Sequence, residues 1–248
     1  MMRRGFFYGL LLLVVLAGGL IAFAPLSFVL RQSEIADRGL GWQQARGTIW
    51  QGQITGLTWQ GDGVGAVNIS SNLLRIFSGK PSHEARWSGP AGQGVALVKV
   101  ERNGGIAEDI SLSIPLTERL GTDPQLAQFG GYLRLVNGQV RYRNGECVAA
   151  SGTVSTDIVR LAAASFDRDW PVLSGSLACS SGNLAATLSG DASDGTQIIL
   201  EGSLSGDLEI VIANADRDVR NALLSAGFVE EGDTYTYTHS DPFNEVTP

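Results

Sequence analysis

Apolar and polar residues alternate along most of the chain after residue 30, and a period of two is typical of β-strands with one buried face. The clearest run is Ile110, Leu112, Ile114 and Leu116, interleaved with Ser111, Ser113 and Pro115. Such runs are separated by Gly, Asn, Asp and Ser, which favour tight turns. The pattern predicts a mainly β fold of antiparallel strands joined by hairpins.

Two dipeptides that favour two-residue hairpin turns predict a three-stranded meander from Tyr132 to about Ala149. They are Asn137-Gly138 and Asn144-Gly145. Counting outward from these turns gives the expected pairs: Leu135 with Val140, Leu133 with Tyr142, Tyr142 with Cys147, and Arg143 with Glu146. The same count sets Arg134 opposite Arg141 on the other face.

Two more hairpins are expected further along the chain. A Ser181-Gly182 turn pairs Cys179 with Leu184, Leu177 with Ala186 and Gly175 with Leu188. A Ser205–Asp207 turn pairs Leu204 with Leu208 and Leu200 with Ile212. Cys147 and Cys179 both point to the apolar face of their hairpins, which is the arrangement that a bridge between them requires.

Few segments have the period of a helix. Asp216 is expected to cap a helix that ends near Gly227, and Asp123-Pro124 to open a short helix to Phe129; residues 157–166 fit a helix or a strand. Since short helices cover only part of an apolar sheet face, we expect a meander-rich curved sheet or a two-layer β domain with one or two short helices. Closure into two layers is favoured, because the 218 residues after residue 30 suffice for such a core.

The first 30 residues differ from the rest. Arg3 and Arg4 precede Gly5–Leu30, which are 26 residues without a charge, and about 20 apolar residues suffice for a transmembrane helix. The positive-inside rule then places the N-terminus in the cytoplasm. We expect residues 1–30 to be a single-pass anchor and residues 31–248 to be an exported β-rich domain. The alternative is a cleaved signal peptide, since Ala22-Phe23-Ala24 has the form of a cleavage site.

The charge of the chain excludes a general nucleic-acid binder, which needs a basic face. The 18 Lys and Arg and 25 Asp and Glu give a net charge of −7. Residues 1–143 carry 14 basic and 9 acidic residues, net +5, whereas residues 144–248 carry 4 and 16, net −12. Two faces with different partners would explain this split, but ordinary solubility charge on strands and turns is the favoured interpretation.

The sequence contains no constellation typical of an enzyme. There is no G-x-S-x-G and no phosphate-binding loop. His83 and His239 stand in polar surroundings and are expected at the surface, and the two Asp-Arg-Asp segments at 167–169 and 216–218 are interpreted as a turn and a helix start. No catalytic residue, metal site or cofactor is therefore expected.

Cys147 and Cys179 are the only cysteines, and neither lies at a spacing typical of a zinc site. Outside the cytoplasm they are expected to pair, closing a loop of 32 residues. The alternative is two buried, reduced cysteines in a cytosolic protein.

A set of local sequences resembles the type II secretion system protein N family over essentially the whole chain. The N-terminal apolar segment leads to Gly47-Thr48-Ile49-Trp50-Gln51-Gly52, with Gly47, Thr48, Trp50 and Gly52 as the motif. Cys147 follows in a glycine-rich region, then Cys179 in Gly175–Cys179, then Ala226-Gly227-Phe228 and a tyrosine-rich final hairpin.

The resemblance implies a non-enzymatic inner-membrane protein with a periplasmic β domain, which contacts other inner-membrane platform proteins of the type II secretion system. The family is also similar to AsmA-like proteins, whose curved sheets form apolar grooves for lipid. The alternative function is therefore a lipid-binding or lipid-transfer module. The two would differ in whether the apolar sheet face is covered or open.

Overall fold

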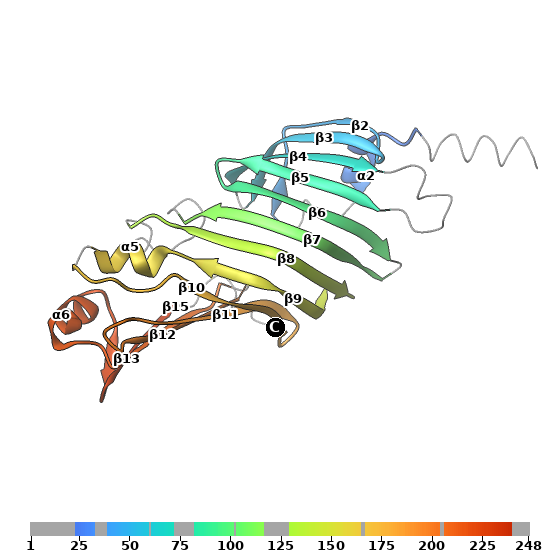
Figure 1. Ribbon diagram of the computed structural model, residues 1–248. Helices are drawn as coiled ribbons and strands as arrows, with labels where there is room; N and C mark the ends of the chain where they lie inside the picture. The colour runs from blue at the N-terminus through green and yellow to red at the C-terminus, as the bar shows by residue number, and fades with distance from the viewer. Residues whose placement is uncertain are drawn as a thin grey trace, which may run out of the picture. The chain divides into compact units, whose positions relative to one another are not determined.

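The computed structural model describes residues 23–32, 39–59, 61–71, 82–101, 103–116, 129–164, 167–203 and 206–239. The chain divides into two compact units, Met1–Pro90 and Ala91–Pro248. Both consist mainly of antiparallel β-strands (Figure 1), which confirms the expected fold class in this respect. No described residues form a helix that is long and apolar enough to span a membrane. Most of the expected anchor, residues 5–22, lies outside the described part of the chain.

The first unit is a small antiparallel sheet with one short helix. Its elements are α2 (Leu26–Gln32), β1 (Leu40–Gly41), β2 (Gln44–Gly47), β3 (Gln51–Trp59), β4 (Asp62–Ser71) and β5 (His83–Gly89). Both β1 and β2 pair with β3, which pairs with β4, which pairs with β5. Leu26 of α2 is buried with Ile54 and Leu57 of β3 in a small apolar cluster. Leu26, which falls near the end of the expected anchor, thus packs against this sheet.

The second unit holds the larger sheet. Its strands are β6 (Gly92–Glu101), β7 (Gly104–Pro115), β8 (Tyr132–Arg143), β9 (Glu146–Thr156), β10 (Leu173–Ser180), β11 (Asn183–Asp191), β12 (Gln197–Ser203), β13 (Leu208–Ala213), β14 (Val229–Glu231) and β15 (Thr234–His239). Each pairs with the next in the order β6 to β13, then β15, then β14. The path does not close on itself among the described strands, so the sheet is open.

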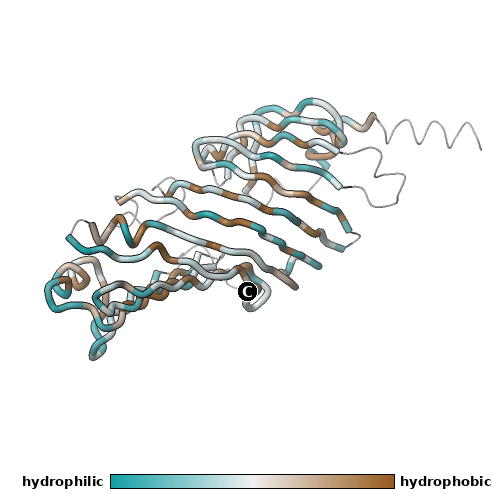
Figure 2. The backbone as a smooth tube through the Cα atoms, viewed as in Figure 1, coloured by the Kyte–Doolittle hydropathy of each residue, from teal (hydrophilic) through white to brown (hydrophobic). Residues whose placement is uncertain are grey.

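One face of this sheet carries the core of the second unit. Apolar residues recur at every second position of its strands, as the alternating brown segments of Figure 2 show. Leu173, Leu188 and Ile198 are almost completely buried. The helices α5 (Ile158–Ala164) and α6 (Arg217–Ser225) pack on the same core through Val159, Ala163, Val219 and Leu223.

Helix α6 confirms the helix expected between Asp216 and Gly227, with Asp216 at its N-cap position. Helix α5 shows that the ambiguous segment 157–166 is helical over Ile158–Ala164. The short helix expected at Asp123-Pro124 lies outside the described residues.

The Asn144-Gly145 and Ser181-Gly182 hairpins have the expected register. Tyr142 pairs with Cys147 and Arg143 with Glu146. Cys179 pairs with Leu184, Leu177 with Ala186 and Gly175 with Leu188. A tight two-residue turn sets the register of the pairs next to it, but the count from Asn144-Gly145 ends at Tyr142, because Arg141 pairs with Ala149 across a bulge.

The hairpin expected at Asn137-Gly138 is wrong, because β8 runs straight through these residues from Tyr132 to Arg143. Asn137 does have the left-handed φ of 52° that a turn would need. Here it forms a β-bulge, since β7 and β9 supply backbone partners on both sides of β8. Arg134 consequently lies opposite Ser113 and Ser155, not opposite Arg141.

Neighbouring strands are bulged at the same level. Asp109 of β7 has a φ of 52°, and Gly152 of β9 has a φ of 145°. The β7–β8 and β8–β9 registers both shift there. A Cβ atom on Gly152 would lie 2.8 Å from the Cα of Gly138. Bulges increase local twist and bend strands, so this row bends the sheet across β7, β8 and β9.

The register expected between β12 and β13 is wrong by two residues. Leu200 pairs with Ile210 instead of Ile212, and Gly202 pairs with Leu208. The turn is displaced by one residue towards the N-terminus, because the Ser203 N–H donates to the Asp207 carbonyl oxygen at 2.9 Å and closes a three-residue turn at 204–206. A shift of two residues keeps the same residues on each face, so the expected apolar face survives.

Replacing Gly152 with Ala tests the aligned bulges. We expect Gly152→Ala to lower the free energy of unfolding by about 1–3 kcal/mol, because the left-handed backbone and the approach to Gly138 exclude a side chain. Gly202→Ala is the matched control. Its Cβ atom would make only ordinary contacts of 3.8–3.9 Å, so its stability should equal or exceed that of the wild type. Denaturant unfolding measures both, and equal stability of Gly152→Ala and wild type would contradict the bulge.

Candidate functional site

The residues of the G-T-x-W-x-G motif form the turn between β2 and β3. Thr48 Oγ1 accepts hydrogen bonds from the N–H groups of Trp50, at 3.3 Å, and Gln51, at 3.2 Å. The Thr48 N–H donates to the Gln51 carbonyl oxygen at 2.9 Å. Gly47 has a φ of 84°, which favours glycine. The motif therefore specifies a closed, internally hydrogen-bonded turn.

This turn also holds the start of helix α2. A Cβ atom on Gly52 would lie 2.6 Å from Leu26 Cδ2 and 2.7 Å from the Thr48 carbonyl oxygen, so glycine leaves room here for both α2 and the turn. Pro25 forms an isolated β-bridge with Thr48. The Ile49 N–H donates to the carbonyl oxygen of Ala24 at 3.3 Å. The motif thus fixes the chain where it leaves the N-terminal apolar segment.

Trp50, the third motif residue, brings a serine and a histidine together. Its ring stacks on His83 with the centroids 5.8 Å apart, and its carbonyl oxygen accepts the Ser71 N–H at 2.8 Å. Ser71 Oγ lies 2.5 Å from His83 Nδ1. Burial lowers the pKa of His83 from its ordinary value of 6.5. His83 is thus half-buried and contacts Trp50 and Ser71, two neighbours that are not visible in the local sequence.

A disulfide joins Cys147 of β9 to Cys179 of β10, with the sulfur atoms 2.01 Å and the Cα atoms 5.5 Å apart. The paired residues of β9 and β10 are only 153–156 and 173–176. Beyond them the strands are held by the disulfide and by a hydrogen bond of 2.7 Å from the Cys147 N–H to the Gly182 carbonyl oxygen. The disulfide thus connects β9 and β10 where the backbone hydrogen bonds of a regular ladder are missing.

An apolar cavity of about 370 Å³ lies on the core face of the second unit. Its walls come from β7, β8 and β9 and from β10 to β13. The lining side chains are mostly aliphatic: Leu112, Ile114, Leu116, Leu133, Leu135, Val154, Ile158, Leu177, Leu184, Leu188, Leu200 and Leu208. The few polar residues include Thr156, Asp207 and His239. We call this cavity the apolar groove. The apolar face is thus partly open, contrary to the favoured closure into two layers.

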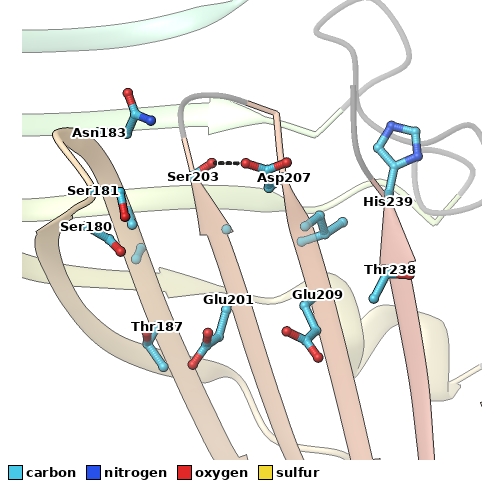
Figure 3. Close-up of a pocket in the computed structure, with 14 residues that line it drawn as sticks. Ser180, Ser181, Asn183, Thr187, Glu201, Ser203, Asp207, Glu209, Thr238 and His239 are labelled. Atoms are coloured by element: carbon cyan, nitrogen blue, oxygen red, sulfur yellow. Dashed lines mark hydrogen bonds between the residues drawn. The ribbon is translucent and has the colours of Figure 1, made fainter. Parts of the chain in front are cut away.

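A second pocket, of about 400 Å³, is lined mostly by polar residues of β10 to β13 and β15 and of their turns (Figure 3). Figure 3 shows Glu201 and Glu209 side by side on neighbouring strands, and they are paired in the β12–β13 register. Carboxylates directly opposite one another repel. Ser203 Oγ donates to Asp207 at 3.2 Å. Among the described residues, no three His, Cys, Asp or Glu side chains are grouped so that they could hold a metal ion.

The two Asp-Arg-Asp segments contact each other, which the sequence did not indicate. Arg168 Nη2 lies 3.0 Å from Asp216 Oδ2 and 3.3 Å from Asp218 Oδ2. Asp167 has a left-handed φ of 57°, typical of a turn, and Asp216 caps α6. The segments are therefore the turn and helix start that were expected, and their charges join two elements that are distant in sequence.

Comparison with known proteins gives one family. The family model described as "Type II secretion system (T2SS), protein N" matches residues 38–236. The type II secretion system protein N of Vibrio cholerae serotype O1 (strain ATCC 39315 / El Tor Inaba N16961) is 28% identical over 167 residues. That alignment covers 64% of this chain and 65% of the relative, so just under two thirds of the relative's length is matched. No solved structure matches the chain significantly.

Loss of the disulfide should destabilise the second unit. Closing a loop of 32 residues is worth about 3.7 kcal/mol in the chain-entropy model. The double variant Cys147→Ala and Cys179→Ala should therefore lower the free energy of unfolding by up to about 4 kcal/mol. Mass spectrometry of non-reduced peptides from the native protein should show Cys147 linked to Cys179. Free thiols at both positions would contradict the pairing.

His83 should make stability depend on pH. Since its pKa is lower in the folded state, the unfolded state binds more protons just below pH 6.5. The stability is complete above this pH and is lost as the pH falls towards the lowered folded value. Unfolding curves measured across this range should show the loss in wild type and a smaller loss in His83→Gln. Equal slopes in the two proteins would contradict the burial of the ring.

Proposed function

Because the chain belongs to the family of type II secretion system protein N, we propose that it is a non-catalytic component of the type II protein secretion system. It is anchored in the bacterial inner membrane by its N-terminal apolar segment, with both β units in the periplasm. There it acts by contact with other inner-membrane platform proteins. The match of the family model over residues 38–236 is the main support for this proposal.

Two independent features support the periplasmic location. Gly5–Leu30 lacks charged residues and follows Arg3 and Arg4, as in an anchor whose N-terminus is cytoplasmic. The disulfide between Cys147 and Cys179 is a feature typical of oxidising compartments. Charge distribution and thiol chemistry are unrelated properties of the chain, and they favour the same side of the membrane.

The outer face of β9, β10 and β11 supports a role in protein contacts. This face carries small hydroxyl residues in register across the three strands: Thr153, Ser176 and Thr187 in one row, and Ser155, Ser174 and Ser189 in the next. All but Ser155 are exposed. A polar sheet face gives a partner protein hydroxyl groups to contact without a large desolvation cost.

The ionisable side chains support a structural role. They form ion pairs between neighbouring elements, such as Lys99 with Glu108, Arg168 with Asp216, and Arg220 with Glu230. Such pairs join strands and helices at the surface. A catalytic site instead collects its titratable groups in a cleft, and the apolar groove is lined mainly by aliphatic residues.

The apolar groove favours a second candidate function, the binding of lipid. Its volume of about 370 Å³ is at the lower end of the range of about 300–1,000 Å³ for ligand sites. Its aliphatic walls match an acyl chain, and the polar residues Asp207 and His239 among its lining match a headgroup. Protein contact and lipid binding predict different neighbours for the two faces of the same sheet.

Photo-crosslinking in the native membrane separates the two functions. The photoreactive residue is placed in the full chain at exposed Ser176, on the outer face of β10, or at Leu184, which lines the groove. Protein contact predicts that Ser176 gives adducts with other secretion-system proteins, whereas Leu184 gives only adducts within the chain. Lipid binding predicts phospholipid adducts at Leu184.

The matched design makes each outcome informative, since both positions belong to the same β10–β11 hairpin. Phospholipid at Leu184 together with no protein at Ser176 would overturn the first candidate in favour of the second. Adducts with proteins outside the secretion system alone would overturn both.

A further inference from the structure

Helix α2, which begins within the predicted membrane segment Gly5–Leu30, and Phe23 just before it expose apolar side chains. Phe23 is 79% exposed, Phe28 is 60% exposed and Val29 is 41% exposed. We propose that this face of α2 lies in the membrane–water interface and contacts lipid, so that the helix fixes the first unit to the membrane surface. The proposal rests on the anchoring proposed above and adds a specific contact surface to it.

The two faces of α2 differ in their contacts. Leu26 is 4% exposed and is buried with Ile54 and Leu57 of β3, and Leu30 packs against the same cluster. Leu26 and Leu30 are four residues apart and share one face. Phe28 lies two residues from each, which places it on the opposite face at about 100° per residue. The sheet therefore occupies one side of α2 and leaves the aromatic side uncovered in the part of the chain that is described.

Lipid is the occupant that the surrounding sequence favours. The chain from Gly5 to Ala22 has no charged residue and continues directly into Phe23. Arg31 follows Phe28 by three residues, so a basic side chain shares the exposed face with the aromatic ring. Aromatic and basic residues together are typical of helices that lie at the membrane surface, where the ring enters the interface and the cation meets lipid phosphates.

The contacts of α2 make it a rigid connector. Pro25 is bridged to Thr48, and Ala24 accepts a hydrogen bond from the Ile49 N–H. Gly52 allows Leu26 to lie directly against β3. If α2 lies in the interface, the turn at 47–52 must lie beside the membrane surface. The far end of β3, at Trp59, then lies up to about 23 Å away, at about 3.3 Å per residue.

Fluorescence quenching by lipid tests this arrangement in the full chain. The variants Phe28→Cys and Asp62→Cys are each labelled with an environment-sensitive fluorophore, while Cys147 and Cys179 remain in their disulfide. Each is reconstituted into vesicles of phosphatidylethanolamine and phosphatidylglycerol, with a phosphatidylcholine that carries a doxyl quencher near its headgroup. Asp62 is the matched control, because it is exposed in the same unit and pairs with Trp59 at the far end of β3.

A face buried about 5–10 Å into the headgroup region should cost the label at position 28 about half of its fluorescence or more. The label at position 62 should be unaffected. Equal quenching at both positions, or shielding of position 28 from iodide without quenching by doxyl lipid, would overturn the proposal in favour of another contact.

The failure of this proposal and the failure of anchoring are distinguishable by vesicle flotation. A chain that floats with the vesicles but shows no quenching at position 28 overturns the interfacial helix alone. A chain that does not float with vesicles overturns the anchoring, and the interfacial helix with it.

Discussion

Burial of one apolar face along an open antiparallel sheet is the constraint on which the second unit depends. Every strand from β7 to β13 supplies apolar side chains at alternate positions, and these must be removed from water. The helices α5 and α6 cover part of this face through residues such as Val159 and Leu223. Much of the rest of this face is buried because the apolar side chains of β7–β9 and those of β10–β13 pack together. The apolar groove is the part that they leave unfilled.

The local irregularities of the sheet follow from this constraint. A flat sheet cannot bring its own apolar residues together, so β7, β8 and β9 are bent by bulges at Asp109, Asn137 and Gly152. Beyond their few paired residues, β9 and β10 are not joined by a backbone ladder, and there the disulfide between Cys147 and Cys179 connects them. The curvature, the bulges and the disulfide therefore all serve the burial of the same apolar face.

The sequence predicts local features well and long-range ones poorly. Two-residue turns set the pairs next to Asn144-Gly145 and Ser181-Gly182, and the helical period after Asp216 predicted α6, because these determinants lie within a few residues. Asn137-Gly138 has the same dipeptide chemistry as a hairpin turn, and only the strands on either side make it a bulge. The contact between Ser71 and His83, the ion pair of Arg168 with Asp216 and the groove walls all depend on separate segments that only the fold brings together. No local pattern indicates such contacts.

An open sheet exposes edges that can recruit strands from other chains. The edge strand of the second unit is β14, which is only three residues long and ends in Glu230 and Glu231. Glu230 is further held by Arg220 Nη2 at 2.6 Å and by the Tyr235 hydroxyl at 3.1 Å. A neighbouring copy that added a strand here would have to remove two carboxylates from water. This edge is therefore protected against pairing with a strand from a second copy of the chain.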